Sequence, residues 1–240
     1  MLTMLLTRHG MTSAGDVMLG GQLDLPLTSE GRAQAQALAH RLAGVRIDRI
    51  VASPMLRALE TAQTVATGRP VEVDDRLREL DYGRWESLTY AEIDDRDSEL
   101  RARWENDPAT THSPGGESGD EVAARAHGFL RDIVAAEMPG GARTRGRSPD
   151  PGGSRGSVSE SQAAAEGQKR VLVVAHGTFN RILLCAALGI PVRDYRRRFI
   201  QDQANLTVLR YEIDDGPDGA QLVLLNDVSH LRGPGEAPWG

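Results

Sequence analysis

Two aliphatic segments that lie far apart in the chain end in the same dipeptide, His-Gly. The first runs from Met4 into an Arg-His-Gly sequence that contains His9, and the second runs from Val171 to His176. Both patterns predict short buried strands that end at the histidine. In an open α/β sheet, ligands bind beyond the carboxyl ends of the strands. If the two strands are parallel neighbours, His9 and His176 face each other across one pocket.

Strand-like and helix-like patterns alternate along the rest of the chain. Short apolar runs predict strands at 2–7, 47–52, 71–73, 171–175, 205–211 and 221–225. Helical spacing of apolar residues predicts helices that follow Thr28, Ser53, Thr89, Ser118 and His176. This alternation predicts a layered α/β fold.

Three of these helices have recognisable start signals. The segments Thr89–Glu92 and Ser118–Glu121 are capping boxes, in which a hydroxyl and a carboxylate satisfy the first backbone N–H groups. Ser53 precedes Pro54, which is the pattern of a cap residue followed by proline at the first helical position. Arg57 then falls in the first turn of that helix, so we expect its side chain to reach the pocket at the strand ends.

Composition restricts the function classes. The chain has 240 residues and a net charge of −6, which argues against general nucleic-acid binding but allows a local basic pocket. Cys185 is the single cysteine, so no intrachain disulfide can form. No apolar run approaches the roughly 18 residues of a membrane span, and the N-terminus lacks the charged start of a signal peptide. We therefore expect a cytoplasmic protein with no membrane association.

The segment 139–169 differs from its surroundings. It is rich in Gly, Ser, Pro, Arg and Ala, and Val158 is its only large aliphatic residue. Such a segment cannot bury enough apolar surface to offset its ordering entropy. We predict a disordered insertion in a single domain that spans 1–240. We interpret this insertion as a solvated linker. Alternatively, the arginines of the insertion contact an acidic partner.

The residues at the predicted strand ends suit an anion, and phosphate is the first candidate. Arg8 and Arg57 can each hold phosphoryl oxygens with two hydrogen bonds, and a protonated His176 can add a third positive donor. His9 can offer a ring nitrogen to phosphorus and form a phosphohistidine. The leaving oxygen then needs a proton, which a partly buried carboxylic acid can supply.

Five motifs in this chain, in the expected order, resemble the histidine phosphatase superfamily, also called the phosphoglycerate mutase-like family. They lie at 6–12, 25–35, 53–62, 77–86 and 175–177. The resemblance covers nearly the whole chain apart from 139–169. It implies a three-layer α/β sandwich whose central, mostly parallel sheet is flanked by helices.

The resemblance also implies a role for each matching residue. His9 would be the phosphorylated nucleophile, and Glu79 would be the proton donor and acceptor. The phosphoryl group would be bound by Arg8, Arg57 and His176, and Gln22 would contact substrate. No metal and no cofactor is implied. Asp81 and Glu86 are neighbouring carboxylates and remain alternatives to Glu79.

The chain departs from the family pattern after Arg-His-Gly. Met11 replaces a common Glu or Gln, and Gly15-Asp16 stands where the family often has Asn. If Asp16 points inward, it disfavours a second anionic group, so we expect substrates with two phosphates to bind poorly.

The segments 114–118 and 226–231 resemble the phosphatase branch, so we predict a phosphatase for a small phosphorylated metabolite. The sequence leaves three alternatives: phosphoglycerate mutase-type transfer, a non-catalytic phospho-ligand binding module, and a metallohydrolase with His9, His176 and Glu79 as ligands. The neighbouring arginines would repel a cation in the last case. The sequence does not determine the oligomeric state, and a homodimer is one of the alternatives.

Overall fold

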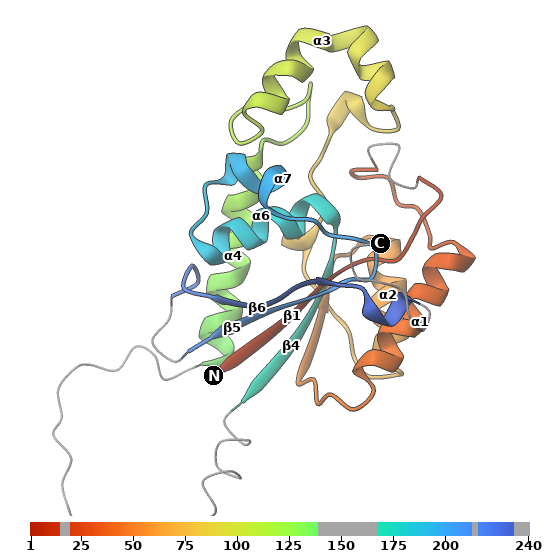
Figure 1. Ribbon diagram of the computed structural model, residues 1–240, viewed down its shortest axis with the longest axis vertical. Coiled ribbons are helices and arrows are strands. Elements are labelled where there is room, and N and C mark those ends of the chain that lie inside the picture. The colour runs from red at the N-terminus through yellow and green to blue at the C-terminus, as the bar shows by residue number, and fades with distance from the viewer. Residues whose placement is uncertain (15–19, 139–167, 213–215, 233–240) are drawn as a thin grey trace, which may run out of the picture.

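A six-stranded sheet forms the centre of the computed structural model, with strand order β3-β2-β4-β1-β5-β6 (Figure 1). The structure describes residues 1–14, 20–138, 168–212 and 216–232. The strands are β1 (Leu2–Arg8), β2 (Arg49–Ala52), β3 (Glu72–Val73), β4 (Lys169–Ala175), β5 (Leu206–Tyr211) and β6 (Gln221–Asp227). The first four in sequence are parallel to one another, and β5 and β6 continue the sheet antiparallel. The predicted mostly parallel sheet is confirmed.

Helices cover both faces of this sheet. The long helices are α1 (Ser29–Leu42), α2 (Leu56–Ala66), α3 (Tyr90–Asn106), α4 (Gly119–Glu137) and α6 (Gly177–Leu188), and α7 (Tyr195–Arg198) is a single turn. Along β4, Val171 and Val173 pack in the core that α4 and α6 cover, whereas Leu172 and Val174 pack against α1 and α2. A strand buried on both faces reads as a continuous apolar run, as this one does. The predicted three-layer α/β sandwich is confirmed.

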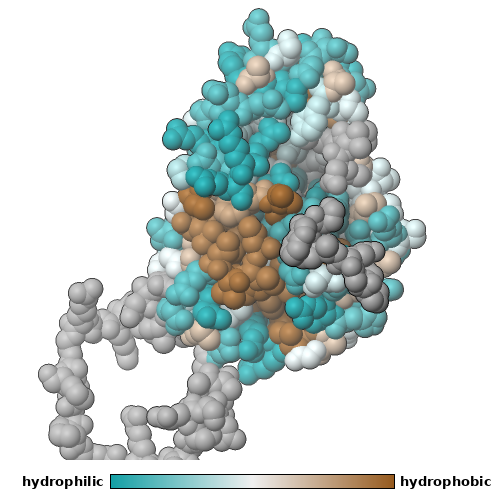
Figure 2. All heavy atoms as spheres, in the orientation of Figure 1, coloured by the Kyte–Doolittle hydropathy of each residue, from teal (hydrophilic) through white to brown (hydrophobic). Residues whose placement is uncertain are grey.

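Helix α3 projects beyond the layered body (Figure 1). It bends at Asp97, whose φ/ψ values are not helical, and Asp97 Oδ2 accepts a hydrogen bond of 2.8 Å from Trp85 Nε1. Trp104 packs edge-on against Trp85, with ring centroids 5.9 Å apart, so the projection has an aromatic centre. Its surface is mostly hydrophilic, whereas an apolar area lies over the region where β6 runs (Figure 2). Leu222, Val223 and Leu225 are the exposed large apolar residues of that strand.

The start of α2 differs from the prediction. The capping boxes at Thr89 and Ser118 are confirmed, but α2 begins at Leu56 rather than at Pro54. Asp24, which lies in a distant loop, accepts a hydrogen bond of 2.6 Å from the Leu56 backbone N–H. The Ser53 hydroxyl lies within hydrogen-bond distance of His176. Capping of α2 thus comes from a tertiary contact that local sequence does not encode.

The predicted insertion falls almost entirely outside the described residues. Residues 139–167 are among those that are not described, so disorder there stays a prediction. Its predicted end is wrong by one residue, because Lys169 already belongs to β4 and pairs with Leu2 of β1.

Cys185 is buried in α6, and burial raises the pKa of its thiol to about 12. Among the described helices, none combines the length and the apolar character needed to cross a membrane.

Candidate active site

The two histidines meet at adjacent strand ends. Strands β1 and β4 pair in parallel so that Arg8 lies opposite Ala175, and His9 and His176 are the next residues. The His9 N–H donates to the Ala175 carbonyl at 3.0 Å, which fixes the two strand ends side by side. The two imidazole rings lie edge-on with their centroids 5.2 Å apart. The juxtaposition expected from the two His-Gly segments is therefore present.

The hydrogen bonds of His9 fix its tautomer. Its Nδ1 lies 2.7 Å from the Gly10 carbonyl oxygen, which can only accept, so Nδ1 carries the proton. The Nε2 atom then holds a lone pair, and Arg57 donates its Nε–H to that atom at 3.1 Å. Burial lowers the pKa of His9 well below its ordinary value, and the charges of Arg57 and Arg8 lower this pKa further. The result is a neutral imidazole with Nε2 available as a nucleophile.

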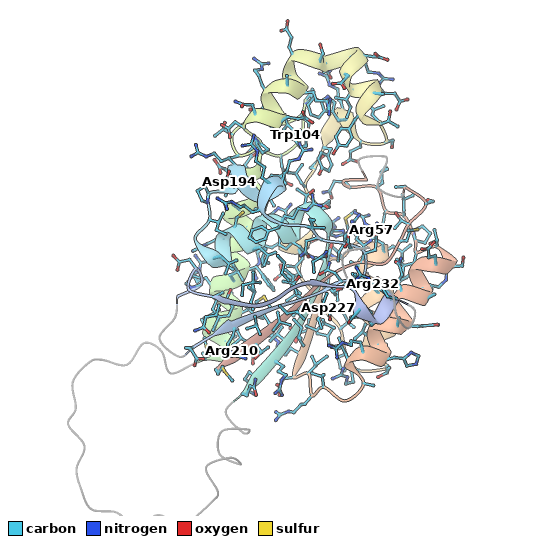
Figure 3. All side chains as sticks on the ribbon, in the orientation of Figure 1. Arg57, Trp104, Asp194, Arg210, Asp227 and Arg232 are labelled. Atoms are coloured by element: carbon cyan, nitrogen blue, oxygen red, sulfur yellow. The ribbon has the colours of Figure 1, made fainter. Side chains whose placement is uncertain are left out.

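Backbone carbonyls hold the two guanidinium groups beside His9. Arg57, in the first turn of α2, donates from one terminal nitrogen to the Gly21 carbonyl at 2.9 Å and from the other to the Leu23 carbonyl. Arg8 donates to the Gln201 carbonyl at 3.0 Å. Figure 3 labels Arg57 near the upper ends of the strands. Both side chains line the same cavity, so two fixed positive charges border His9.

His176 lies deeper than His9. Its Nε2 is 2.7 Å from the Ser53 hydroxyl, and its Nδ1 is buried without a hydrogen-bond partner among the described residues. The ring is fully buried and is not among the residues that line the cavity. Burial lowers the pKa of His176 well below its ordinary value, and the charge of Arg57 adds to this effect. The structure therefore favours a neutral His176 ring, whereas the sequence allowed a protonated one.

Glu79 places a carboxylate at the N-terminus of α6. Its Oε1 accepts hydrogen bonds of 2.8 Å from the backbone N–H groups of Leu80 and Phe179. Its Oε2 accepts one of 3.0 Å from the Thr178 N–H. A helix N-terminus favours a negative group of this kind, and the side chain lines the cavity.

The two alternative carboxylates face elsewhere. Asp81 Oδ1 accepts from the Gly83 N–H at 2.7 Å, and Glu86 Oε1 accepts from the Gln22 N–H at 2.7 Å. Burial raises the pKa of Glu86, but neither this side chain nor Asp81 lines the cavity. The position of Glu79 on the cavity wall supports its selection over both neighbours.

Two long side chains anchor the backbone at Glu79. The Gln22 amide donates to the Glu79 carbonyl at 2.8 Å, and Arg125 of α4 donates to the same oxygen at 3.1 Å. Arg125 also bonds the carbonyls of Arg76 and Arg78, a role that no local sequence signal indicates. Gln22 is not among the cavity-lining residues. Its contact with substrate stays a prediction, and its observed contact is with the Glu79 backbone.

The cavity has a volume of about 270 Å³. Its lining residues are Arg8, His9, Thr12, Ala14, Gly20, Gly21, Leu25, Arg57, Glu79, Tyr82, Tyr90, Gly177, Thr178, Arg181, Gln201 and Asp202. Among the polar lining residues, sequence reasoning missed Tyr90, Thr178, Arg181, Gln201 and Asp202. Arg181 lies four residues after Gly177, so helical spacing gave a signal for it. In the described part of the chain, no group of three or more His, Cys, Asp or Glu side chains is arranged to hold a metal ion.

The chain is similar to known proteins in sequence and in fold. The family described as the histidine phosphatase superfamily (branch 1) matches residues 4–142 and 154–228. A glucosyl-3-phosphoglycerate phosphatase of Mycobacterium tuberculosis is 37% identical over 196 residues, which are 80% of this chain and 78% of that protein. A protein named Probable phosphoglycerate mutase GpmB, from an Enterobacter species, is 29% identical over 98% of this chain and 97% of its own length. The solved structure of Bacillus stearothermophilus YhfR superposes with a TM-score of 0.76 at 28% identity, covering 97% of this chain and all of that one.

Proposed function

Because the chain belongs to the histidine phosphatase superfamily, we propose that it hydrolyses phosphate monoesters of small metabolites through a phosphorylated His9, without a metal ion. One observation carries this proposal. The neutral His9 ring presents its Nε2 atom to the Nε–H of Arg57, and Arg8 lines the same cavity as these two residues. A nucleophile flanked by fixed positive charges suits a phosphoryl group, whose charge is spread over three oxygens.

In the first step, His9 Nε2 attacks phosphorus and the ester P–O bond breaks. Arg57 withdraws its hydrogen bond from Nε2 and donates to a phosphoryl oxygen instead, and Arg8 holds another oxygen. Glu79 takes up a proton that enters with the monoanionic ester and gives it to the leaving oxygen, which departs as an alcohol. His9 then carries the phosphoryl group on Nε2 and keeps its Nδ1–H bond to Gly10.

In the second step, water replaces the alcohol. The Glu79 carboxylate takes a proton from this water, whose oxygen attacks phosphorus while the N–P bond breaks. Inorganic phosphate leaves and the neutral His9 returns. The three backbone N–H groups that hold the Glu79 side chain keep it oriented for both proton transfers.

In this proposal His176 acts on the phosphoryl group through its charge, because its ring lies beside His9 but does not line the cavity. Its contact with Ser53 sets the ring orientation, and its unpartnered Nδ1 can accept or release a proton. When a phosphate dianion lies nearby, the attraction between opposite charges favours the protonated ring. His176 then offsets charge that Arg8 and Arg57 leave uncompensated.

A mutase is the second candidate, favoured by the similarity to Probable phosphoglycerate mutase GpmB over nearly the whole chain. The two functions share the phosphorylation of His9 and differ in the acceptor, which is water for a phosphatase and a second hydroxyl for a mutase. The higher identity to a named phosphatase supports hydrolysis. A cytoplasmic location and a homodimer stay predictions.

Hydrolysis of 4-nitrophenyl phosphate in the presence of a chelator tests this proposal. We expect phosphate release from the wild type, no release from His9→Ala, and an acid-labile phosphoenzyme that the variant does not form. His127→Ala is the matched control, because His127 lies on an exposed part of α4. Full activity of His9→Ala would contradict the proposal. Transfer between hydroxyls without net phosphate release would favour the mutase.

A further inference from the structure

Arg181 is a third guanidinium on the wall of the active-site cavity. It belongs to α6, four residues after Gly177 and three after Thr178, and all three residues line the cavity. Positions separated by three or four residues share one face of a helix. The Arg181 side chain is half-buried and its Nε atom is fully buried. This charge therefore belongs to the cavity and not to the outer surface.

The other charged groups on this wall have partners. Arg8 and Arg57 bind backbone carbonyls, and Glu79 binds three backbone N–H groups. Asp202 accepts a hydrogen bond of 2.8 Å from the Asn226 amide.

Arg181 differs from them, because no hydrogen bond or ion pair joins it to any other residue that the structure describes. A buried donor without a partner is unfavourable, so its retention on a cavity wall needs an explanation.

We propose that Arg181 binds an anionic group, a carboxylate or a second phosphate, on the leaving-group half of the substrate. This inference rests on the proposed phosphatase function and adds a substrate class to it. A guanidinium binds planar carboxylates and phosphates with two parallel hydrogen bonds. A bound anion would satisfy the buried donor and offset a charge that the described residues leave unpaired.

The geometry of α6 determines where this anion would lie relative to the ester oxygen. The leaving oxygen must lie beside Glu79, because Glu79 protonates it in the proposed mechanism. The Glu79 carboxylate lies at the first turn of α6, and Arg181 follows about one helical turn later, a rise of about 5.4 Å. The anion thus lies a few bonds from the ester oxygen, on the side of the alcohol. Tyr82 and Tyr90 line the same cavity and can pack against the intervening carbon atoms.

This substrate class opposes the expectation drawn from Asp16. That residue lies outside the described residues, so its effect on a second anion is untested. Asp202 is the acidic residue on the described wall besides Glu79, and its carboxylate is engaged by Asn226. The described wall carries three arginines against two carboxylates, which favours a substrate with more than one negative group.

Short alkyl phosphates whose far end differs test the inference. The probes are 3-phosphooxypropanoate, propane-1,3-diyl bisphosphate and neutral-ended 3-hydroxypropyl phosphate. We expect the wild type to show the highest kcat/KM with one of the two charged-ended probes, and the better of these identifies the anion. Arg181→Met should lower kcat/KM for that probe about 10-fold to 100-fold, mainly through KM. For the neutral-ended probe the change should be less than about 3-fold.

Two further variants separate recognition from structure. Arg181→Lys keeps a positive charge and should retain part of the preference, with a thermal unfolding midpoint close to that of Arg181→Met. Arg197→Met removes an exposed arginine that does not line the cavity and should leave the preference unchanged. A wild type without preference for charged-ended probes, or an equal loss on all probes in Arg181→Met, would overturn the inference.

Binding separates failure of this inference from failure of the proposed function. Calorimetry on the His9→Ala protein measures the affinity for the same probes without turnover. Tighter binding of a charged-ended probe that disappears when Arg181→Met is added supports the inference even if none is hydrolysed. Equal binding of all probes contradicts it even if all are hydrolysed.

Discussion

The Nε–H of Arg57 points at the Nε2 lone pair of His9, with the two nitrogens 3.1 Å apart. One guanidinium therefore keeps the nucleophile unprotonated and lies where a phosphoryl oxygen has to bind. This contact also means that Arg57 must exchange its hydrogen bond to His9 for one to substrate before the N–P bond can form.

The protonation of His9 should depend on Arg57. Burial, and after it the charges of Arg57 and Arg8, lower the pKa of His9, so this ring should stay neutral as the pH falls from 8 to below 6.5. In Arg57→Gln one lowering charge is gone, so the ring should protonate at a higher pH than in the wild type. NMR titration of the histidine ring nitrogens measures the pKa of His9 in the wild type and in the variant. His9 titrating at or above its ordinary pKa in the wild type would contradict the prediction.

Glu79→Gln should affect substrates according to their leaving groups. Alkyl phosphates need a proton on the departing oxygen, so kcat should fall about 100-fold or more. Aryl phosphates with acidic phenols need little protonation, so their phosphorylation step should change far less. Burst kinetics separates the phosphorylation of His9 from the following hydrolysis, in which Glu79 activates water. Equal slowing of phosphorylation on both substrates would remove Glu79 from the acid role.

Gln22→Met should reproduce part of the Glu79 defect. Its amide donates to the Glu79 carbonyl, so removal of this bond should loosen the carboxylate and lower kcat more for alkyl than for aryl phosphates. The sequence-based prediction differs. If the Gln22 side chain binds substrate directly, its replacement should raise KM for alkyl and aryl phosphates alike. Steady-state kinetics with both substrate classes distinguishes the two. An increase in KM with unchanged kcat would favour direct contact.

Gly10→Ala should destabilise the active-site loop. An added Cβ at Gly10 would lie 2.4 Å from the Gly31 carbonyl oxygen, which is backbone and cannot swing away. We expect the free energy of unfolding to fall by about 1–3 kcal/mol, measured by urea denaturation. Gly44→Ala is the control, since a Cβ added at Gly44 would meet no other part of the described structure within 4 Å. An unfolding midpoint of Gly10→Ala equal to that of the control would show that the loop accommodates the methyl group.

Strand ends are the part of this site that local patterns predict well. The apolar runs before His9 and His176 are buried strands, and parallel pairing of neighbours brings their ends together. Arg57 was predictable because it follows a helix start, even though α2 begins two residues later than Pro54. The error there has a physical cause, since Asp24 replaces the expected local cap.

Contacts across the fold were beyond sequence reasoning. The choice of Glu79 over Asp81 and Glu86 depends on the path of an irregular segment that has no periodicity. Arg125 holds that path from a separate helix through the carbonyl of Glu79, and its sequence position carries no sign of this. Arg181 had the correct helical spacing, but the sequence did not indicate that this face of α6 lines a cavity.

Helix α6 contributes to three parts of the site. It follows His176 directly, its first turn holds the Glu79 carboxylate, and its next turn carries Arg181. Loop positions such as Gly20, Gly21 and Leu25 line another part of the cavity. The backbone of this loop cannot be exchanged freely, because the Gly21 and Leu23 carbonyls hold Arg57 and the Gln22 amide holds the Glu79 carbonyl. A designer who wants a new specificity should therefore vary Leu25 and Arg181, which line the cavity, and keep the path of the loop.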